Sequence, residues 1–165
     1  MARVATIKIK KFKSYKEYAL EIDSNYQHII IYGDNGVGKT NLIESLSFFS
    51  NSKGLRGDNL EKILPEQDLN VVDTKVKTKI FLNSNQYDFS YKIKKDQENL
   101  KKNFYLNDKK ITLPKIKEII SFIWLSPYMD KIMYEGQSIK RSFIDKMISQ
   151  NEKNFNLSLS SYKKN

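Results

Sequence analysis

The chain has 165 residues, of which 39% are hydrophobic and 29% charged, as is usual for one globular domain. Lys and Arg total 29 against 19 Asp and Glu, and the net charge of +10 favours an anionic partner. Because cysteine is absent and His28 is the only histidine, the composition excludes disulfides and metal sites built from thiolate or imidazole clusters. No apolar run approaches the ~18 residues of a membrane-spanning helix, so we expect a soluble, cytoplasmic protein.

The N-terminal third predicts three strands. Apolar residues alternate with polar ones over residues 3–10 and again over 18–22, the pattern of two antiparallel strands with one buried face each. The run from His28 to Tyr32 is continuously apolar, which is typical of a strand covered on both faces at the centre of a sheet. His28 itself is expected to be a packed or edge residue rather than a catalytic one.

A glycine-rich segment and a helix follow. From residue 41 to about 50, apolar side chains recur at helical spacing (Leu42, Ile43, Leu46 and Phe49). Residues 51–67 are polar, contain Gly54, Gly57 and Pro65, and are expected to form a loop. The order is therefore strand, glycine-rich loop, helix.

The second half of the chain predicts two hairpins, one buried strand and two helices. The hairpins join residues 72–80 to 87–94 and 104–106 to 111–113. Pro114 opens a short helix, and 119–125 is expected to be a second strand covered on both faces, beside 28–32. Ser138 is the expected N-cap of a final amphipathic helix. Together these elements predict an α/β fold whose mixed sheet has central parallel strands and antiparallel hairpins.

Lysines gather on one side of the first of these hairpins, at Lys75, Lys77, Lys79, Lys92 and Lys94. Lysines in such a row position the phosphates of DNA without reading its bases. A solvated sheet face is the competing interpretation, since only three basic residues are arginine and the Lys, Asn and Ile usage is typical of an AT-rich coding sequence. The abundant Tyr and Phe residues, at strand alternation, are expected to be core rather than base-stacking platforms.

Residues 33–40 match the phosphate-binding pattern G-x-x-x-x-G-K-[ST] without exception and lie between a predicted strand and a predicted helix. In such a P-loop, backbone N–H groups wrap the phosphates, the lysine contacts the β- and γ-phosphates, and the hydroxyl of Thr40 holds Mg²⁺. The expected ATP site comprises Gly33, Asp34, Asn35, Gly36, Val37, Gly38, Lys39, Thr40 and Asn41. The motif alone leaves kinases, GTPases, motor ATPases and repair ATPases open, as well as a glycine turn that binds nothing.

Several sequence blocks indicate which class of P-loop protein this is. The two strands before the loop, the intervening segment Lys11 to Tyr15 and the helix start Thr40 to Glu44 resemble the ABC-type ATPases of the SMC and RecF group. Ser52 to Arg56, Trp124 to Pro127 with Met129 and Asp130, and the block from Gly136 through Lys140 and Arg141 to Asp145 resemble the RecF family in particular. Lys13 stands where that family usually has arginine, Lys140 replaces one of its paired arginines, and Ser142 interrupts a basic run. Lysine lacks the bidentate fork with which arginine contacts phosphate.

The resemblance implies an ATP-binding lobe over 1–137 and the beginning of a helical lid over 138–165. Family members are longer and later carry an ABC-type Ser-Gly signature loop and a Walker B strand, which this chain lacks after Asp145. We therefore interpret it as the N-terminal part of a RecF-type protein, which is not expected to hydrolyse ATP alone.

The resemblance further implies ATP and Mg²⁺ as cofactors, an ATP-dependent homodimer, and binding to duplex DNA beside single-stranded gaps. Arg56, Lys75, Lys77 and Lys79 are the candidate DNA contacts. It also implies recombination mediator partners, a role in recombinational repair and the SOS response through recombinase loading, and no membrane association. Two alternatives stay open: a non-catalytic interaction fragment that ATP only stabilises, and another SMC-like ATPase.

Overall fold

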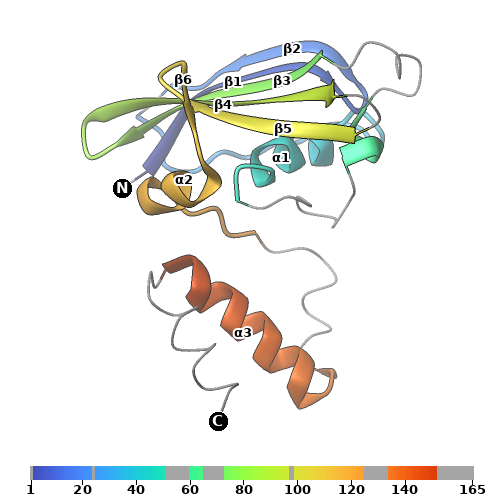
Figure 1. The fold of residues 1–165 in the computed structure, drawn as a ribbon, viewed down its shortest axis with the longest axis vertical. Coiled ribbons are helices and arrows are strands. Elements are labelled where there is room, and N and C mark those ends of the chain that lie inside the picture. The colour runs from blue at the N-terminus through green and yellow to red at the C-terminus, as the bar shows by residue number, and fades with distance from the viewer. Residues whose placement is uncertain are drawn as a thin grey trace.

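The computed structural model describes residues 2–23, 25–50, 60–64, 73–96, 99–124 and 134–151. Six strands form a single sheet in the order β2-β1-β3-β4-β5-β6, and every neighbouring pair is antiparallel (Figure 1). The strands are β1 (Ala2–Phe12), β2 (Tyr15–Glu21), β3 (Asp73–Leu82), β4 (Asn85–Asp96), β5 (Asn99–Leu106) and β6 (Lys109–Ile111).

In the described ranges, the sheet is accompanied by the α-helices α1 (Lys39–Ser47), α2 (Leu113–Ile119) and α3 (Gln137–Asn151) and by the 3₁₀ turn η1 (Leu60–Ile63). Helices α1 and α2 lie against the same face of the sheet, whereas α3 stands apart below them (Figure 1). None of the helices in the described ranges is long and apolar enough to cross a membrane.

The core lies between the inner face of the sheet and α1. Along β3 every second residue is buried, and the same alternation places Phe89, Tyr91 and Ile93 of β4 on that face. Phe48 and Phe49, which follow α1, are fully buried; Phe49 packs edge to face with Phe89 and Tyr91, and the ring of Phe48 is tilted against that of Tyr91. The aromatic residues on the inner face of the sheet thus serve as core, as the strand alternation predicted, whereas Tyr32 and Tyr134 are exposed.

The predicted hairpins are confirmed. Strands β1 and β2 pair through a two-residue turn, with Phe12 opposite Tyr15. Strands β3 and β4 pair where the alternation placed them, and β5 pairs with β6, although β6 covers Lys109–Ile111 rather than the predicted residues 111–113. The short helix opened by Pro114 is also confirmed, since α2 has proline in its first turn.

The two strands expected to be buried on both faces are not formed. Residues 28–32 are irregular, and the side chains of Ile30 and Tyr32 are 86% and 90% exposed. The physical reason is that a strand needs a hydrogen-bonded neighbour, and the neighbour expected for this segment, residues 119–125, forms no strand in its described part. His28 is accordingly exposed, neither packed nor part of a strand edge.

The prediction of a strand at residues 119–125 was also wrong for the residues that the structure describes. Ile119 is the last residue of α2, residues 120–124 are irregular, and Leu125 lies outside the described residues. Without these two strands, the sheet has no parallel centre in the ranges described. The α/β class holds, but its described sheet is antiparallel rather than mixed.

Two helix boundaries differ slightly from prediction. α1 begins at Lys39, inside the glycine-rich motif, and its buried side includes Glu44 and Ser45 while Ile43 is 46% exposed. α3 begins at Gln137, so Ser138 lies within the first turn instead of capping it. The apolar face expected for α3 is partly exposed, as at Ile139 and Ile144.

Candidate nucleotide-binding site

The glycine-rich loop turns sharply at the start of α1. Gly36 has φ +87° and Gly38 has φ +99°, a backbone region that side-chain-bearing residues rarely adopt. A Cβ atom at Gly36 would meet nothing within 4 Å, so this part of the loop is open. The loop can therefore accept a ligand against its backbone.

The first N–H groups of α1 are available to that ligand. Gly38 occupies the N-cap position and supplies no side-chain hydrogen bond, and the amides of Lys39, Thr40 and Asn41 have no partner in the described part of the chain. These groups also carry the positive end of the helix dipole. Their chemistry suits a phosphate group.

Lys39 lies across the loop. Its ammonium group donates to the carbonyl oxygens of Gly33 at 2.7 Å and Asp34 at 2.6 Å. These contacts keep the positive charge beside the open backbone. A phosphate that replaced the two carbonyls would gain a charge-assisted hydrogen bond.

Thr40 offers one oxygen ligand of the kind that a magnesium ion binds. Its side chain is exposed, and its hydroxyl makes no hydrogen bond to any residue that the structure describes. Mg²⁺ is held in such sites by a few protein oxygens together with phosphate oxygens and water. The open cradle and the unengaged hydroxyl fit a Mg²⁺–nucleotide ligand.

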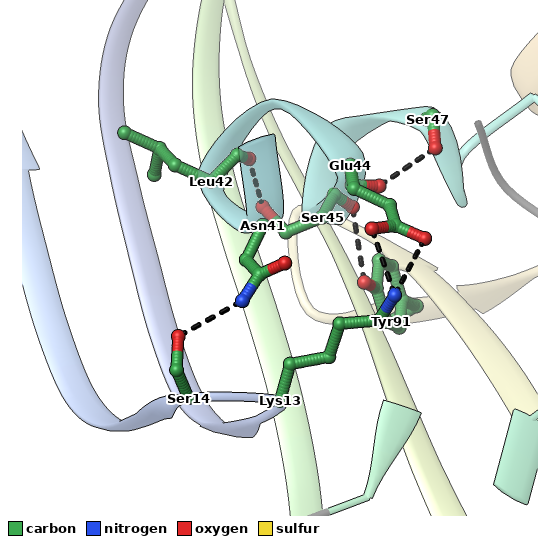
Figure 2. Close-up of polar contacts among 8 residues, drawn as sticks. All are labelled: Lys13, Ser14, Asn41, Leu42, Glu44, Ser45, Ser47 and Tyr91. Atoms are coloured by element: carbon green, nitrogen blue, oxygen red, sulfur yellow. Dashed lines mark hydrogen bonds and ion pairs between the residues drawn. The ribbon is translucent and has the colours of Figure 1, made fainter. Parts of the chain in front are cut away.

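The turn between β1 and β2 holds the side of α1. The two turn residues and Tyr15, the first residue of β2, each contact one position at α1: Lys13 binds Glu44, Ser14 accepts from Asn41, and Tyr15 donates to Gly38. Figure 2 shows the first two of these contacts. Because positions 38, 41 and 44 are three residues apart, they share one face of the helix.

The contact between Lys13 and Glu44 is a buried ion pair. The Lys13 ammonium lies 2.9 and 2.8 Å from the two carboxylate oxygens, and the Glu44 side chain is fully buried. Lys13 also adopts φ +49°, and its backbone N–H donates to the carbonyl of Ile63 at 2.6 Å. Lys13, which stands where the resembling family usually has arginine, therefore forms its ion pair with Glu44 of α1.

Two side chains from the sheet hold the other end of α1. Tyr91 donates its hydroxyl to the carbonyl of Ser45 at 3.0 Å (Figure 2), and Lys102 donates to the carbonyl of Phe48 at 3.0 Å. The Lys102 ammonium lies over the rings of Phe48 and Phe104, and burial lowers the pKa of Lys102 to about 7. Burial, followed by the charge of Glu44, raises the pKa of Tyr91 well above its usual value.

The candidate DNA contacts lie on the opposite face of the sheet from α1. The side chains of Lys75, Lys77 and Lys79 alternate with the buried residues of β3, and on that outer face Lys75 is flanked by Lys10 of β1 and Lys92 of β4. A cavity of about 450 Å³ on this face is lined by Lys8, Lys10, Lys75, Lys77 and Lys92, together with the acidic residues Glu17 and Asp73. Lys77 is partly neutralised, since its ammonium lies 3.5 Å from Asp88.

Several other predicted positions lie away from the loop or outside the described residues. Arg56, the rest of Ser52 to Arg56, and the stretch from Leu125 to Asp130 are outside the described residues. Lys140 and Arg141 lie in the first half of α3, away from the loop in Figure 1. The structure therefore brings together residues 33–41, but not the basic positions of the two later blocks.

Sequence reasoning missed the residues that hold the loop from outside. The roles of Ser14, Tyr15, Glu44, Tyr91 and Lys102 depend on contacts between segments distant in the chain. The one signal in the sequence is an acidic residue, Glu44, within the otherwise uncharged helix that follows Lys39. A charge on the buried side of a helix calls for a partner.

A P-loop opening an α-helix that packs against a sheet defines the class as a P-loop nucleotide-binding protein. The model of the RecF/RecN/SMC N terminal domain family matches residues 3–129, and the chain belongs to this family. It is 28% identical to the DNA replication and repair protein RecF of Rickettsia akari over 87% of the chain and 38% of that protein. It is 30% identical to RecF of Rickettsia bellii over 85% of the chain and 37% of that protein.

A solved structure shows the same fold. The SMC head domain from Thermotoga maritima superposes with a TM-score of 0.52 at 15% identity, covering 72% of this chain and 42% of that one. The chain spans less than two fifths of the length of the RecF relatives named above. The similarity thus confirms the RecF-type family and fold expected from the motifs.

Proposed function

We propose that the chain is the ATP-binding lobe of a RecF-type protein acting in DNA replication and repair, with MgATP bound at residues 33–41. The phosphates contact the free amides of α1, Lys39 shifts from the loop carbonyls to the β- and γ-phosphates, and Thr40 holds Mg²⁺. The main support for this proposal is that the loop is open at Gly36, beside three backbone amides of α1 that form no hydrogen bond with the described residues. Membership of the RecF/RecN/SMC family supports it independently.

Titration of the 165-residue chain with a fluorescent ATP analogue tests the site. We expect saturable binding that needs Mg²⁺ and is competed by ATP, without turnover by this chain alone. The amide resonances of Lys39, Thr40 and Asn41 should shift on titration. Absence of saturable binding, or binding that leaves those three resonances unmoved, overturns the assignment.

We further propose that the outer face of β3 contacts DNA, as duplex beside a single-stranded gap. The proposal relies on Lys75 and Lys79, because Lys77 forms an ion pair with Asp88 and Arg56 lies outside the described residues. No described helix covers this face in Figure 1. Phosphate contacts by lysine position a duplex without reading its sequence.

A pair of double variants tests the DNA surface. Lys75→Ala with Lys79→Ala should weaken binding to gapped duplex and lower the slope of log affinity against log salt by about 1.8, at ~0.9 for each phosphate that is no longer neutralised. Lys115→Ala with Lys117→Ala removes two exposed charges from α2 on the opposite side of the sheet and should change neither. Equal weakening in the two variants would mean that the charge acts nonspecifically.

We also propose how the chain assembles. Residues 1–137 form the nucleotide-binding lobe and 138–165 begin a helical lid, of which α3 is the described part. ATP closes a homodimer, and the protein acts in the cytoplasm with recombination mediators in recombinase loading and the SOS response. Duplex affinity that rises with ATP supports this proposal, whereas ATP-independent affinity favours the alternative of a nucleotide-stabilised interaction fragment.

A further inference from the structure

The carbonyl oxygen of Gly38 accepts two hydrogen bonds. The backbone N–H of Leu42 donates to it at 3.0 Å, as the first hydrogen bond of α1, and the hydroxyl of Tyr15 donates to it at 3.1 Å. A carbonyl oxygen has two lone pairs, so this acceptor is fully used. Both donors come from outside the loop motif.

These two hydrogen bonds fix the orientation of the whole peptide unit, including its N–H group. The peptide unit between Gly38 and Lys39 is planar and trans, so its N–H points opposite to its C=O. Since the C=O points along the helix toward Leu42, the N–H of Lys39 points out of the helix start, toward the open side of the loop. Fixing one end of the unit therefore fixes the direction of a phosphate-binding amide.

Tyr15 is well placed for this task because it is itself constrained. Its ring lies against Tyr18 with 5.0 Å between centroids, and its hydroxyl would lie 3.0 Å from a Cβ atom at Gly38. Gly38 thus supplies the space that the hydroxyl occupies, as well as the positive φ. Burial, and then the neighbouring Tyr18, raises the pKa of Tyr15, so the phenol remains a donor at neutral pH.

Ser14 adds a second link from the same turn. Its hydroxyl accepts from the side-chain amide of Asn41 at 2.9 Å, at the third residue of α1 (Figure 2). The turn therefore engages the first helical turn at two points. A rotation of the helix start relative to β1 would break both contacts.

We infer that Tyr15 is a positioning residue for nucleotide binding, which holds the Gly38–Lys39 peptide so that the Lys39 amide faces the phosphates. This inference rests on the proposed function and adds to it a residue outside the P-loop motif. Tyr15 does not touch the nucleotide. It acts through the carbonyl of Gly38.

The test compares two variants, each without one phenol hydroxyl. Tyr15→Phe keeps the ring and removes the donor to Gly38, whereas Tyr18→Phe removes the hydroxyl of the adjacent ring, which makes no hydrogen bond in the described part of the chain. We expect Tyr15→Phe to bind MgATP about 3- to 10-fold more weakly, the effect of one neutral hydrogen bond. Tyr18→Phe should bind like the unaltered chain.

A second readout separates positioning from a general loss of structure. In the nucleotide-free protein, the amide resonance of Lys39 should move in Tyr15→Phe and not in Tyr18→Phe, while the resonance of the core residue Val76 stays in place in both. Tyr15→Phe that binds MgATP normally, or that leaves the Lys39 amide unmoved, overturns the inference alone. Failure of the unaltered chain to bind MgATP overturns the proposed function and this inference with it.

Discussion

The ammonium group of Lys13 lies within 2.9 Å of both carboxylate oxygens of Glu44, a residue with no exposed surface in the middle of α1. Such a pair is costly to desolvate, and its attraction repays the cost only because the geometry is close and bidentate. Removal of one partner takes this close counter-charge away from the buried charge of the other. The pair therefore makes the turn before β2 a structural part of the P-loop helix.

Lys13→Met should destabilise the fold strongly. The buried Glu44 carboxylate loses its counter-charge, and we expect a loss of about 3–5 kcal/mol in the free energy of unfolding. Urea denaturation measures this loss. Lys10→Met is the matched control, because Lys10 pairs with Asp73 at 3.0 Å with both side chains about half exposed, and its denaturation midpoint should hardly change. Similar midpoints for the two variants would contradict the role assigned to burial.

Lys39→Ala should abolish ATP binding and leave the fold nearly intact. The Lys39 ammonium is bonded only to loop carbonyls in the described structure, so its loss costs little packing. Fluorescence titration measures the binding, and thermal unfolding measures the fold. Lys117→Ala, which removes an exposed charge of α2, should bind ATP normally. Normal affinity in Lys39→Ala would refute the site.

Alanine at Gly38 should be more damaging than alanine at Gly36. Both positions have positive φ, so each substitution carries backbone strain of about 1–3 kcal/mol. Only at Gly38 does the new Cβ atom also approach within 3.0 Å of Tyr15 and 3.1 Å of Ser14. The difference between the two free energies of unfolding reports the close approach of the turn, and equal values would mean that strain alone matters.

Stability should rise with pH between about pH 7 and pH 10 through Lys102. The folded protein loses the Lys102 proton near pH 7, whereas the unfolded chain keeps it up to its ordinary pKa of 10.5, so the unfolded state binds more protons in that interval. The free energy of unfolding therefore increases with pH. Near pH 10 and above, the raised pKa of Tyr91 acts with the opposite sign, because the folded state then holds the extra proton.

Lys102→Met should flatten this rise, as measured by urea denaturation at several pH values. The thioether can occupy the same site among Phe48, Tyr91 and Phe104 without a charge. Lys101→Met, at the neighbouring exposed position, should retain the rise. A profile that stays steep in Lys102→Met would assign the pH dependence to other groups.

Local patterns predicted the hairpins and the P-loop well, because period-two alternation and glycine spacing are set by neighbouring residues. They failed at residues 28–32, where apolar composition indicates a strand but a strand also needs a partner, and the expected partner is irregular over residues 120–124. They also placed Ile43 on the buried side of α1, whereas Glu44 occupies that side. Glu44 is paired there with Lys13, 31 residues earlier, a counter-charge that no local pattern reveals.

Strand β1 connects the proposed DNA-binding face of the sheet with the candidate nucleotide-binding site. Lys8 and Lys10 project from its outer side, and its last residue, Phe12, leads directly into the turn that touches Gly38, Asn41 and Glu44. A polyanion that shifted this strand would also shift the turn. Because binding free energies are reciprocal, each ligand would then alter the affinity for the other by the same factor. A single β-strand would be enough to couple the two binding sites.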